Sequence, residues 1–455
     1  MSIDELLGKI KRIHFIGIGG SGMCPLAEIL HSKGYILSGS DNNETDTLKR
    51  IRNLGITVYM GQKAENIQGA EMIVYTAAIM EDNPELIAAK ASSIPTFERS
   101  KLFGAISRKF DNCIGVCGTH GKTTTTSMIV HTLIKAGMDT SAVIGGKLPL
   151  IGANGLVGNS ELFVCEACEF KDTFLDLSPA CAVILNVDAD HLEYFGTLDN
   201  IIHSFHKFAD MSSTVIFNGD DNNTLKSVEG LTNKRMISFG ESESCEWVAK
   251  NVIMNGAYAE YDAYHNGEFA LHLKLSVTGR HNVLNSLSAL ATCCYAGLTP
   301  DECKAGIESF GGAGRRFEKL YEKDGILIAD DYAHHPAELE VTINAAMSMG
   351  YKRFIAVFQP FTFSRTAMLF DDFVRVLSIP DKCVMTEIMG SREKNTYDIH
   401  TSQLAEKIPD SLWFDTFEKV TDYLYDNLQE GDFIMTLGCG DVYKIAKMLI
   451  ERLKG

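Results

Sequence analysis

The sequence predicts an α/β protein whose parallel sheets are divided among three domains. Short apolar strands alternate with helical patterns along all 455 residues, and this alternation is typical of parallel sheets. Glycine-rich or polar segments follow several strands, at the sheet edge where α/β proteins bind ligands. At roughly 100–200 residues a domain, a chain of this length accommodates two to four domains. We expect domains at residues 1–108, 109–313 and 314–455.

The first predicted domain opens with a strand, a glycine turn and a helix, followed by further strands. These elements are expected at Arg12–Ile16, Met23–Lys33, Tyr35–Asp41 and Met72–Thr76. The turn, Gly17-Ile-Gly-Gly-Ser-Gly22, fits the pattern GxGxxG, and Asp41 closes the next strand at the spacing of a dinucleotide site. This geometry recognises a pyrophosphate without specifying the nucleotide. An NAD(P)-dependent oxidoreductase is one hypothesis, and an enzyme that acts on a nucleotide-linked substrate is another.

The second predicted domain contains a phosphate loop. The strand Cys113–Cys117 leads into Gly118-Thr-His-Gly-Lys-Thr123, and a helix is expected over Thr124–Lys135. Glycines let backbone N–H groups face phosphate oxygens, and the helix N-terminus adds about half a positive charge. Lys122 is suited to reach the β- and γ-phosphates of ATP, and the Thr123 hydroxyl to bind Mg²⁺.

Two acidic segments that follow later strands are candidates for a magnesium site. They are Glu166-Ala-Cys-Glu169 and Asn186-Val-Asp-Ala-Asp-His191, which follow strands expected at Leu162–Cys165 and Cys181–Val187. Mg²⁺ prefers oxygen ligands, often one or two carboxylates together with substrate phosphates. A solvated acidic loop, or a helix cap at Asp190, accounts for the same residues.

The third predicted domain again has strands that end in polar or glycine residues. They are expected at Gly325–Ala329, Phe354–Phe358, Cys383–Met385 and Phe433–Leu437. The carboxyl ends of these strands are therefore where a further ligand site is expected.

Composition argues against several classes of protein. A formal net charge of -17 disfavours a nucleic-acid-binding protein, because such proteins carry basic patches. No apolar run approaches the ~20 residues of a membrane helix, and no secretory signal precedes the first strand, so we expect a cytoplasmic protein without membrane insertion. The 12 cysteines are then small core residues. This includes Cys165-Glu-Ala-Cys168, because no second CxxC completes a zinc site.

Motifs along essentially the whole chain resemble those of the Mur ligases of peptidoglycan synthesis. Besides the glycine turn and the phosphate loop, these motifs include Ser38-Gly-Ser-Asp41, Asn186–His191, Gly279-Arg-His-Asn-Val-Leu-Asn285, Gly314-Arg-Arg-Phe-Glu318, Asp330–Glu338, Phe358-Gln-Pro360 and Gly438-Cys-Gly-Asp-Val-Tyr443. Single motifs of this length are weak, but so many in order are specific. The resemblance implies a Rossmann-like N-terminal domain for a UDP-sugar, a P-loop ATPase-like central domain, and a Rossmann-like C-terminal domain for an amino acid.

The reaction implied by the resemblance joins the carboxylate of UDP-N-acetylmuramate to the amine of L-alanine, with ADP and phosphate as products. A carboxylate is a poor electrophile at neutral pH, so phosphorylation by ATP first creates an acyl phosphate with a good leaving group. Both transfers develop negative charge, so preorganised cations and Mg²⁺ are expected to supply most of the catalysis. We expect a monomer or a weak homodimer.

The resemblance also assigns roles to individual residues. The expected catalytic residues are Lys122, Glu166, His191 and Arg316; Thr123 and Glu166 would hold one Mg²⁺ and His191 a second. The expected ATP-binding residues are Gly118, Thr119, His120, Gly121, Lys122, Thr123, Thr124, Asn282, Asn285 and Asp331. The expected UDP-sugar-binding residues are Gly17, Gly19, Gly20, Gly22, Met23, Ser40, Asp41 and Thr76. His335 and Arg365 are expected to bind the amino acid, because arginine pairs with carboxylates through two hydrogen bonds.

Two departures from the family pattern bear on the acceptor and the metal. Phe361 and Thr362 stand where the family commonly has histidine and a basic residue, which leaves selectivity for alanine over glycine or serine open. Cys168 replaces the usual acidic residue after Glu166-Ala. The nearest alternative is a ligase that attaches a preformed peptide to the same sugar nucleotide during cell-wall recycling. Another is a regulatory nucleotide-binding protein that does not catalyse a reaction.

Overall fold

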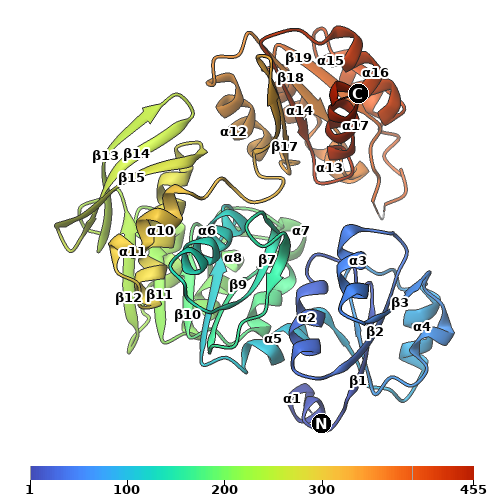
Figure 1. Ribbon diagram of the computed structural model, residues 1–455, viewed down its shortest axis with the longest axis vertical. Helices are drawn as coiled ribbons and strands as arrows, with labels where there is room; N and C mark the ends of the chain where they lie inside the picture. The colour runs from blue at the N-terminus through green and yellow to red at the C-terminus, as the bar shows by residue number, and fades with distance from the viewer. Residues whose placement is uncertain (1, 392, 455) are drawn as a thin grey trace. The chain divides into compact units, whose positions relative to one another are not determined.

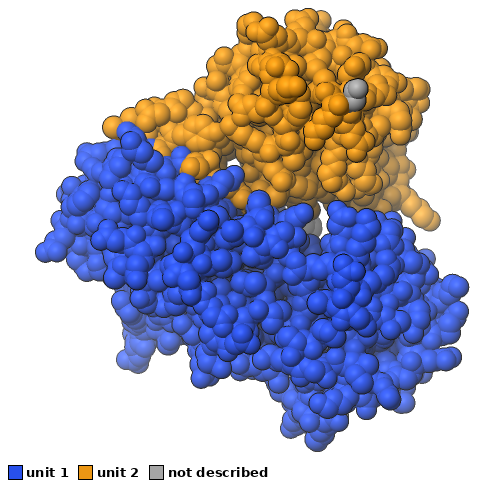
Figure 2. Space-filling view, in the orientation of Figure 1, with its two compact units in different colours: residues 1–252, 260–275, 283–311 blue, residues 253–259, 276–282, 312–455 orange. Residues whose placement is uncertain are grey.

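The computed structural model describes residues 2–391 and 393–454 and confirms the predicted α/β fold with parallel sheets (Figure 1). The described residues form one sheet of five strands, one of ten and one of six. They group into two compact units (Figure 2). The first unit comprises residues 1–252, 260–275 and 283–311, and the second comprises residues 253–259, 276–282 and 312–455.

The five-stranded sheet is parallel throughout, in the order β3-β2-β1-β4-β5. Its strands are β1 (Arg12–Ile16), β2 (Ile36–Asp41), β3 (Thr57–Met60), β4 (Met72–Tyr75) and β5 (Thr96–Glu98). Its helices are α1 (Ile3–Leu7), α2 (Cys24–Ser32), α3 (Asp46–Asn53), the 3-10 helix η1 (Ala64–Ile67), α4 (Pro84–Ala91) and α5 (Arg99–Ser107). Because the strand order reverses at β1, the turn that follows β1 lies where Rossmann-like sheets bind ligands.

The ten-stranded sheet has the order β15-β14-β13-β12-β11-β10-β6-β9-β7-β8. Its strands are β6 (Asn112–Cys117), β7 (Ser141–Leu148), β8 (Ala153–Leu156), β9 (Leu162–Glu166), β10 (Cys181–Ile184), β11 (Thr214–Asn218), β12 (Arg235–Gly240), β13 (Trp247–Asn255), β14 (Tyr258–His265) and β15 (Glu268–Thr278). The accompanying helices are α6 (Lys122–Lys135), the 3-10 helix η2 (Phe170–Asp176), α7 (Leu192–Phe195), α8 (Leu198–Asp210), α9 (Asn222–Val228), α10 (His281–Tyr295) and α11 (Pro300–Glu308).

One strand prediction in this sheet was wrong. The strand expected to run as far as Val187 ends at Ile184, because the chain beyond it turns to bond the phosphate loop instead of a neighbouring strand. The helix expected from Thr124 begins two residues earlier, at Lys122.

The six-stranded sheet is doubly wound, with helices on both faces. In the order β16-β17-β21-β18-β19-β20, its strands are β16 (Glu318–Lys323), β17 (Ile326–Asp331), β18 (Arg353–Phe358), β19 (Lys382–Thr386), β20 (Leu412–Phe414) and β21 (Asp432–Leu437). Its helices are α12 (Pro336–Met347), α13 (Phe363–Met368), α14 (Phe370–Leu377), α15 (Thr401–Lys407), α16 (Phe417–Asn427) and α17 (Tyr443–Lys454). Apolar residues of α12, α14 and α15 share one core cluster and those of α16 and α17 another, which explains why the strands β18, β19 and β21 are mostly apolar.

Two glycines allow close contact between the five-stranded and ten-stranded parts of the first unit. Gly104 of α5 faces the carbonyl oxygen of Asp176, where an added Cβ would lie 2.0 Å from that oxygen. Gly155 of β8 faces Pro25 of α2, and an added Cβ would lie 2.5 Å from the Cβ of the proline. Lys101 on α5 also pairs with Asp176, with 2.7 Å between Nζ and Oδ1. Backbone packing therefore joins these two parts.

The cysteines behave as core residues, as expected. All 12 are free thiols, and Cys165 is fully buried in β9 while Cys168 is half-buried. In the part of the chain that the structure describes, no helix is both long and apolar enough to cross a membrane.

We predict that Gly104→Ala destabilises the protein although alanine is the better helix former. The new methyl group would overlap the Asp176 carbonyl, and overpacking of this kind costs about 1–3 kcal/mol or more. Gly8→Ala is the matched control, because a Cβ there meets its nearest atom at an ordinary 3.6 Å. Thermal unfolding of both variants checks this, and equal melting temperatures would contradict the proposed close contact.

Candidate active site

The phosphate loop between β6 and α6 depends on two glycines in the left-handed region of backbone conformation. Gly118 has φ +143° and Gly121, which precedes the first residue of α6, has φ +84°. An added Cβ at Gly121 would lie 2.7 Å from Oδ1 of Asn285. The predicted ATP-binding residue Asn285 is therefore in contact with the loop. Asn282, the other predicted ATP-binding residue of α10, is the second residue of that helix, and its Nδ2 donates to the Thr278 carbonyl at 2.7 Å.

Asn186 holds the loop in this conformation. Its Oδ1 accepts from the His120 N–H at 2.8 Å, and its Nδ2 donates to the His120 carbonyl at 3.0 Å. Its own carbonyl accepts from the Thr119 N–H at 3.0 Å. The Thr119 hydroxyl in turn accepts from the Asp188 N–H at 2.8 Å. The segment after β10 thus fixes the loop through four hydrogen bonds, three to its backbone and one to the Thr119 hydroxyl.

Lys122 is held at the base of the loop. Its Nζ donates to the carbonyl oxygens of Gly118 at 2.6 Å and Thr119 at 3.1 Å, and to Oε1 of Glu169 at 2.9 Å. Burial opposes the charged form, but the Glu169 carboxylate outweighs this effect and raises the pKa of Lys122, so the ammonium stays protonated. Glu169 is itself buried, and its Oε2 has no hydrogen-bond partner among the described residues.

Two of the residues proposed as Mg²⁺ ligands, Thr123 and Glu166, are in contact. The Thr123 hydroxyl donates to Oε1 of Glu166 at 2.9 Å, and the Gly145 N–H donates to Oε2 at 2.8 Å. Hydroxyl and carboxylate oxygens suit Mg²⁺, which takes its remaining ligands from phosphates and water. In the described residues no group of three or more His, Cys, Asp or Glu could hold a metal. The pair therefore fits a metal that a bound nucleotide helps to coordinate.

His191 lies on the loop after β10 in a left-handed conformation, with φ +54°. Its ring is 4.7 Å, centroid to centroid, from that of Phe170, and its Nε2 is 3.8 Å from Oδ2 of Asp190. A role for His191 at a second metal stays a prediction.

The glycine turn after β1 is stabilised by the end of β2. The Gly17 and Ile18 N–H groups donate to the Ser40 carbonyl, at 2.9 and 3.0 Å, and the Gly19 N–H donates to Oδ2 of Asp41 at 3.0 Å. At Gly17, with φ +84°, an added Cβ would lie 2.7 Å from Cγ2 of Thr76.

The Ser40 side chain is fully buried within a polar network of the five-stranded sheet. Its hydroxyl donates to Glu85 at 2.6 Å, and the other carboxylate oxygen of Glu85 is 2.6 Å from Nε2 of His14. The predicted sugar-binding residues Ser40 and Asp41 therefore both stabilise the turn, Ser40 through its backbone carbonyl and Asp41 through its carboxylate.

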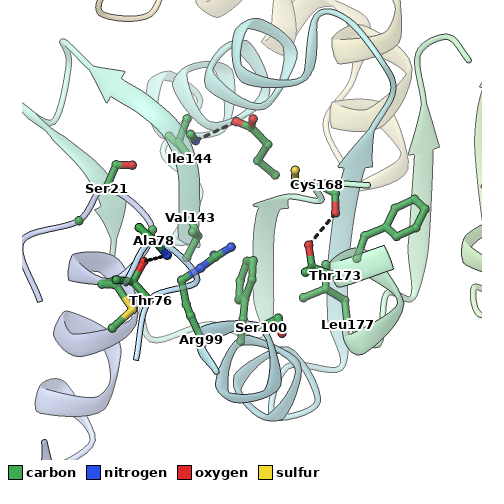
Figure 3. A pocket seen from close by; sticks show the side chains of 17 residues that line it. Ser21, Thr76, Ala78, Arg99, Ser100, Val143, Ile144, Cys168, Thr173 and Leu177 are labelled. Atoms are coloured by element: carbon green, nitrogen blue, oxygen red, sulfur yellow. Dashed lines mark hydrogen bonds between the residues drawn. The ribbon is translucent and has the colours of Figure 1, made fainter. Parts of the chain in front are cut away.

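A cavity of about 350 Å³ is lined by this turn and by Glu166, one member of the proposed metal pair; Figure 3 shows the cavity. Its lining includes Gly20, Gly22, Met23 and Thr76 from the five-stranded part and Glu166 from the ten-stranded part of the first unit. The turn predicted to bind one nucleotide and a carboxylate predicted to bind the metal of the other thus border one space.

In the second unit, Asp331 organises the loop that follows β17. Its two carboxylate oxygens accept from the N–H groups of Phe317 at 2.7 Å and Ala333 at 2.8 Å. Burial raises the pKa of Asp331 to about 6, against the opposing effect of the Arg316 guanidinium. The guanidinium of Arg316 lies over the ring of Tyr332, 5.3 Å from its centroid.

His334, the first of the two adjacent histidines, lies near two other residues of the predicted acceptor region. His334 lies edge-on to Phe361, 6.3 Å between centroids, and is close enough to Arg365 for the guanidinium to contribute to lowering its pKa, although burial is the main cause. His335 is the N-cap of α12, where its Nδ1 accepts from the Ala337 N–H at 3.3 Å. The side chain of Arg365 makes no hydrogen bond or ion pair within the described ranges.

Comparison with family models decides the classification. The Mur ligase family catalytic domain matches residues 12–111, the Mur ligase middle domain residues 116–293, and the Mur ligase glutamate ligase domain residues 315–440. The chain belongs to the Mur ligase family.

Individual Mur ligases match over the full length of the chain. A UDP-N-acetylmuramate–L-alanine ligase of Caldanaerobacter subterraneus is 41% identical over 100% of both chains. One of Acetivibrio thermocellus is 41% identical over 97% of this chain and 96% of its own. The solved UDP-N-acetylmuramate–alanine ligase of Thermotoga maritima has a TM-score of 0.85 and 26% identity, covering 97% of this chain and 99% of that one. A murein peptide ligase of Psychrobacter arcticus shares the fold, with a TM-score of 0.77 and 22% identity, covering 98% of this chain and 99% of that one.

Sequence reasoning missed three residues of this Mur ligase. Asn186 was noted only as part of an acidic segment, and Glu169 was not assigned as the partner of Lys122. Arg315 was overlooked beside Arg316, yet it donates to Asp330 at 2.7 Å and to the Gly440 carbonyl at 3.0 Å. A signal existed for Asn186 and Arg315, because both stand within family motifs.

We predict that Asn186→Ala weakens MgATP binding by about tenfold or more, because it removes two hydrogen bonds that shape the loop, each worth about 1 kcal/mol. Asn200→Ala is the control, since Asn200 makes one comparable bond, to the Phe195 carbonyl at 2.7 Å, away from the loop. Calorimetric titration with MgATP measures both variants. Unchanged affinity in Asn186→Ala would contradict the role given to Asn186.

Proposed function

We propose that the chain is an ATP-dependent ligase that joins L-alanine to the carboxylate of UDP-N-acetylmuramate in peptidoglycan precursor synthesis. The single observation that carries the proposal is the cavity bordered by both the glycine turn and Glu166. A dehydrogenase needs only the turn, whereas a ligase that activates a nucleotide-linked carboxylate needs both elements. The names of the full-length relatives support the choice of substrates.

In the first step of the proposed reaction, the phosphate loop binds the ATP that phosphorylates the muramate carboxylate. A carboxylate oxygen of the muramate attacks the γ-phosphorus of ATP, the bond from that phosphorus to the bridging oxygen breaks, and ADP leaves. Backbone N–H groups of the loop and the Lys122 ammonium stabilise the charge that develops on the phosphate oxygens. Mg²⁺, held by Thr123 and Glu166, supplies further positive charge there when it is bound.

The acceptor half requires a neutral amine. The nitrogen of L-alanine attacks the carbonyl carbon of the acyl phosphate, the carbon–oxygen bond to phosphate breaks, and the nitrogen loses a proton. In this proposal Arg365 binds the alanine carboxylate, and His334 and Phe361 line the space around the methyl group. His334 suits an apolar neighbour, because burial is the main cause of its lowered pKa and favours the neutral ring.

The proposal assigns residues 1–108 to the UDP-sugar, 109–313 to ATP and 314–455 to the amino acid. It places the enzyme in the cytoplasm as a monomer or weak homodimer. Preference for a preformed peptide over alanine is the competing outcome.

The deciding experiment supplies UDP-N-acetylmuramate and MgATP with L-alanine, glycine, L-serine or a tripeptide, and measures phosphate release and product mass. We expect fastest turnover with L-alanine and loss of turnover in Lys122→Met. Lys135→Met, at the other end of α6, is the matched control and should stay active. Turnover with the tripeptide but not with alanine would replace the proposal by the recycling ligase.

A second prediction concerns Arg365. We expect Arg365→Gln to raise KM for alanine by about tenfold or more while KM for ATP stays constant, because a charge-assisted hydrogen bond contributes about 1.5–3 kcal/mol. The control is Arg375→Gln, since Arg375 is an exposed arginine of α14 that pairs with Glu340. Parallel increases in KM for both substrates would argue against a carboxylate contact.

A further inference from the structure

The cavity in the first unit contains a cation that none of the assignments above uses. Arg99 begins α5 and extends from it into the cavity (Figure 3). Its guanidinium lies 5.8 Å from the centre of the Phe103 ring. It is half-buried, and burial lowers the pKa of the guanidinium by disfavouring its charged form.

The side chain of Arg99 makes no hydrogen bond or ion pair in the part of the chain that the structure describes. The groups that act on it electrostatically are Cys168 and Glu98. Burial raises the pKa of the Cys168 thiol, so that side chain is neutral at physiological pH. A desolvated, unpaired arginine is costly to keep, and an anionic ligand would remove that cost.

The position of Arg99 shows which anion it fits. An added Cβ at Gly22 would lie 3.0 Å from a terminal nitrogen of Arg99 and 3.3 Å from its Cζ. The guanidinium therefore stands directly beside the glycine turn, where the backbone suits a pyrophosphate. Glu166, in contrast, belongs to the proposed metal pair on the ten-stranded part. A carboxylate that reacts with ATP must approach that pair.

We propose that Arg99 binds the pyrophosphate of the UDP-sugar and completes the anion site that the turn begins. The inference rests on the function proposed above and adds a binding residue to it. Arg99 supplies the positive charge that the turn lacks, since a glycine turn offers only backbone N–H groups. Two oxygens of the pyrophosphate can accept the two parallel hydrogen bonds that the N–H groups of a guanidinium donate. Lysine would offer only a point charge.

The test compares binding of two sugar nucleotides by titration calorimetry. UDP-N-acetylglucosamine has the pyrophosphate but no lactyl carboxylate, whereas UDP-N-acetylmuramate has both. We expect Arg99→Gln to weaken binding of both by a similar factor, about 10- to 100-fold, and to leave MgATP binding unchanged. Arg99→Lys should recover part of the loss. Lys109→Gln, which removes an exposed cation near the end of the same helix, should bind like the wild type.

Other outcomes overturn the inference in distinguishable ways. A loss confined to UDP-N-acetylmuramate would assign Arg99 to the carboxylate and refute a pyrophosphate contact. Equal binding by Arg99→Gln and the wild type would refute the inference while leaving the proposed ligase intact. Wild-type protein that binds MgATP but neither sugar nucleotide would refute the proposed function and this inference together. A loss of MgATP affinity in Arg99→Gln as well would show that the residue acts on folding.

Discussion

The side-chain amide of Asn186 pairs with both polar groups of the His120 backbone, and the candidate site depends on this arrangement. A phosphate loop must keep its backbone in a conformation that glycine permits but does not enforce, since glycine also permits many others. Bonds from Asn186 and Asp188 restrict that freedom from the neighbouring strand end. With the backbone fixed, α6 begins at Lys122, and Thr123 comes within 2.9 Å of Glu166.

An enzyme with a net charge of -17 must bind two polyanionic nucleotides, so its positive potential has to be local. Backbone N–H groups at helix starts provide part of it. The side chains provide the rest in two different ways: Lys122 is paired with Glu169, whereas the side chain of Arg99 makes no hydrogen bond or ion pair among the described residues. A phosphate that binds Lys122 replaces the Glu169 carboxylate as its partner. A phosphate that binds Arg99 pairs with a guanidinium that had no ion pair before.

Local sequence patterns allowed the fold class and the loops to be predicted. They did not allow prediction of the long-range contacts that hold the side chains of the site in place. The strand Arg12–Ile16 and the loop Gly118–Thr123 were read correctly because periodicity and glycine spacing act over a few residues. Glu169 and Lys122 are 47 residues apart, and only packing of β9 beside β6 brings them together. Similarly, the choice between His334 and His335 depends on where α12 begins, and the sequence marks a helix start only approximately.

The glycine contacts at Gly104 and Gly155 have a thermodynamic consequence for inhibition. Because neither contact leaves room for a Cβ, we expect the walls of the cavity that carries Arg99 and Glu166 to be positioned when the chain folds. The conformational entropy of those walls is lost during folding. The binding of a ligand therefore does not include this entropy loss. A rigid molecule shaped to this cavity would therefore retain more of its contact energy as affinity than one aimed at a mobile surface loop.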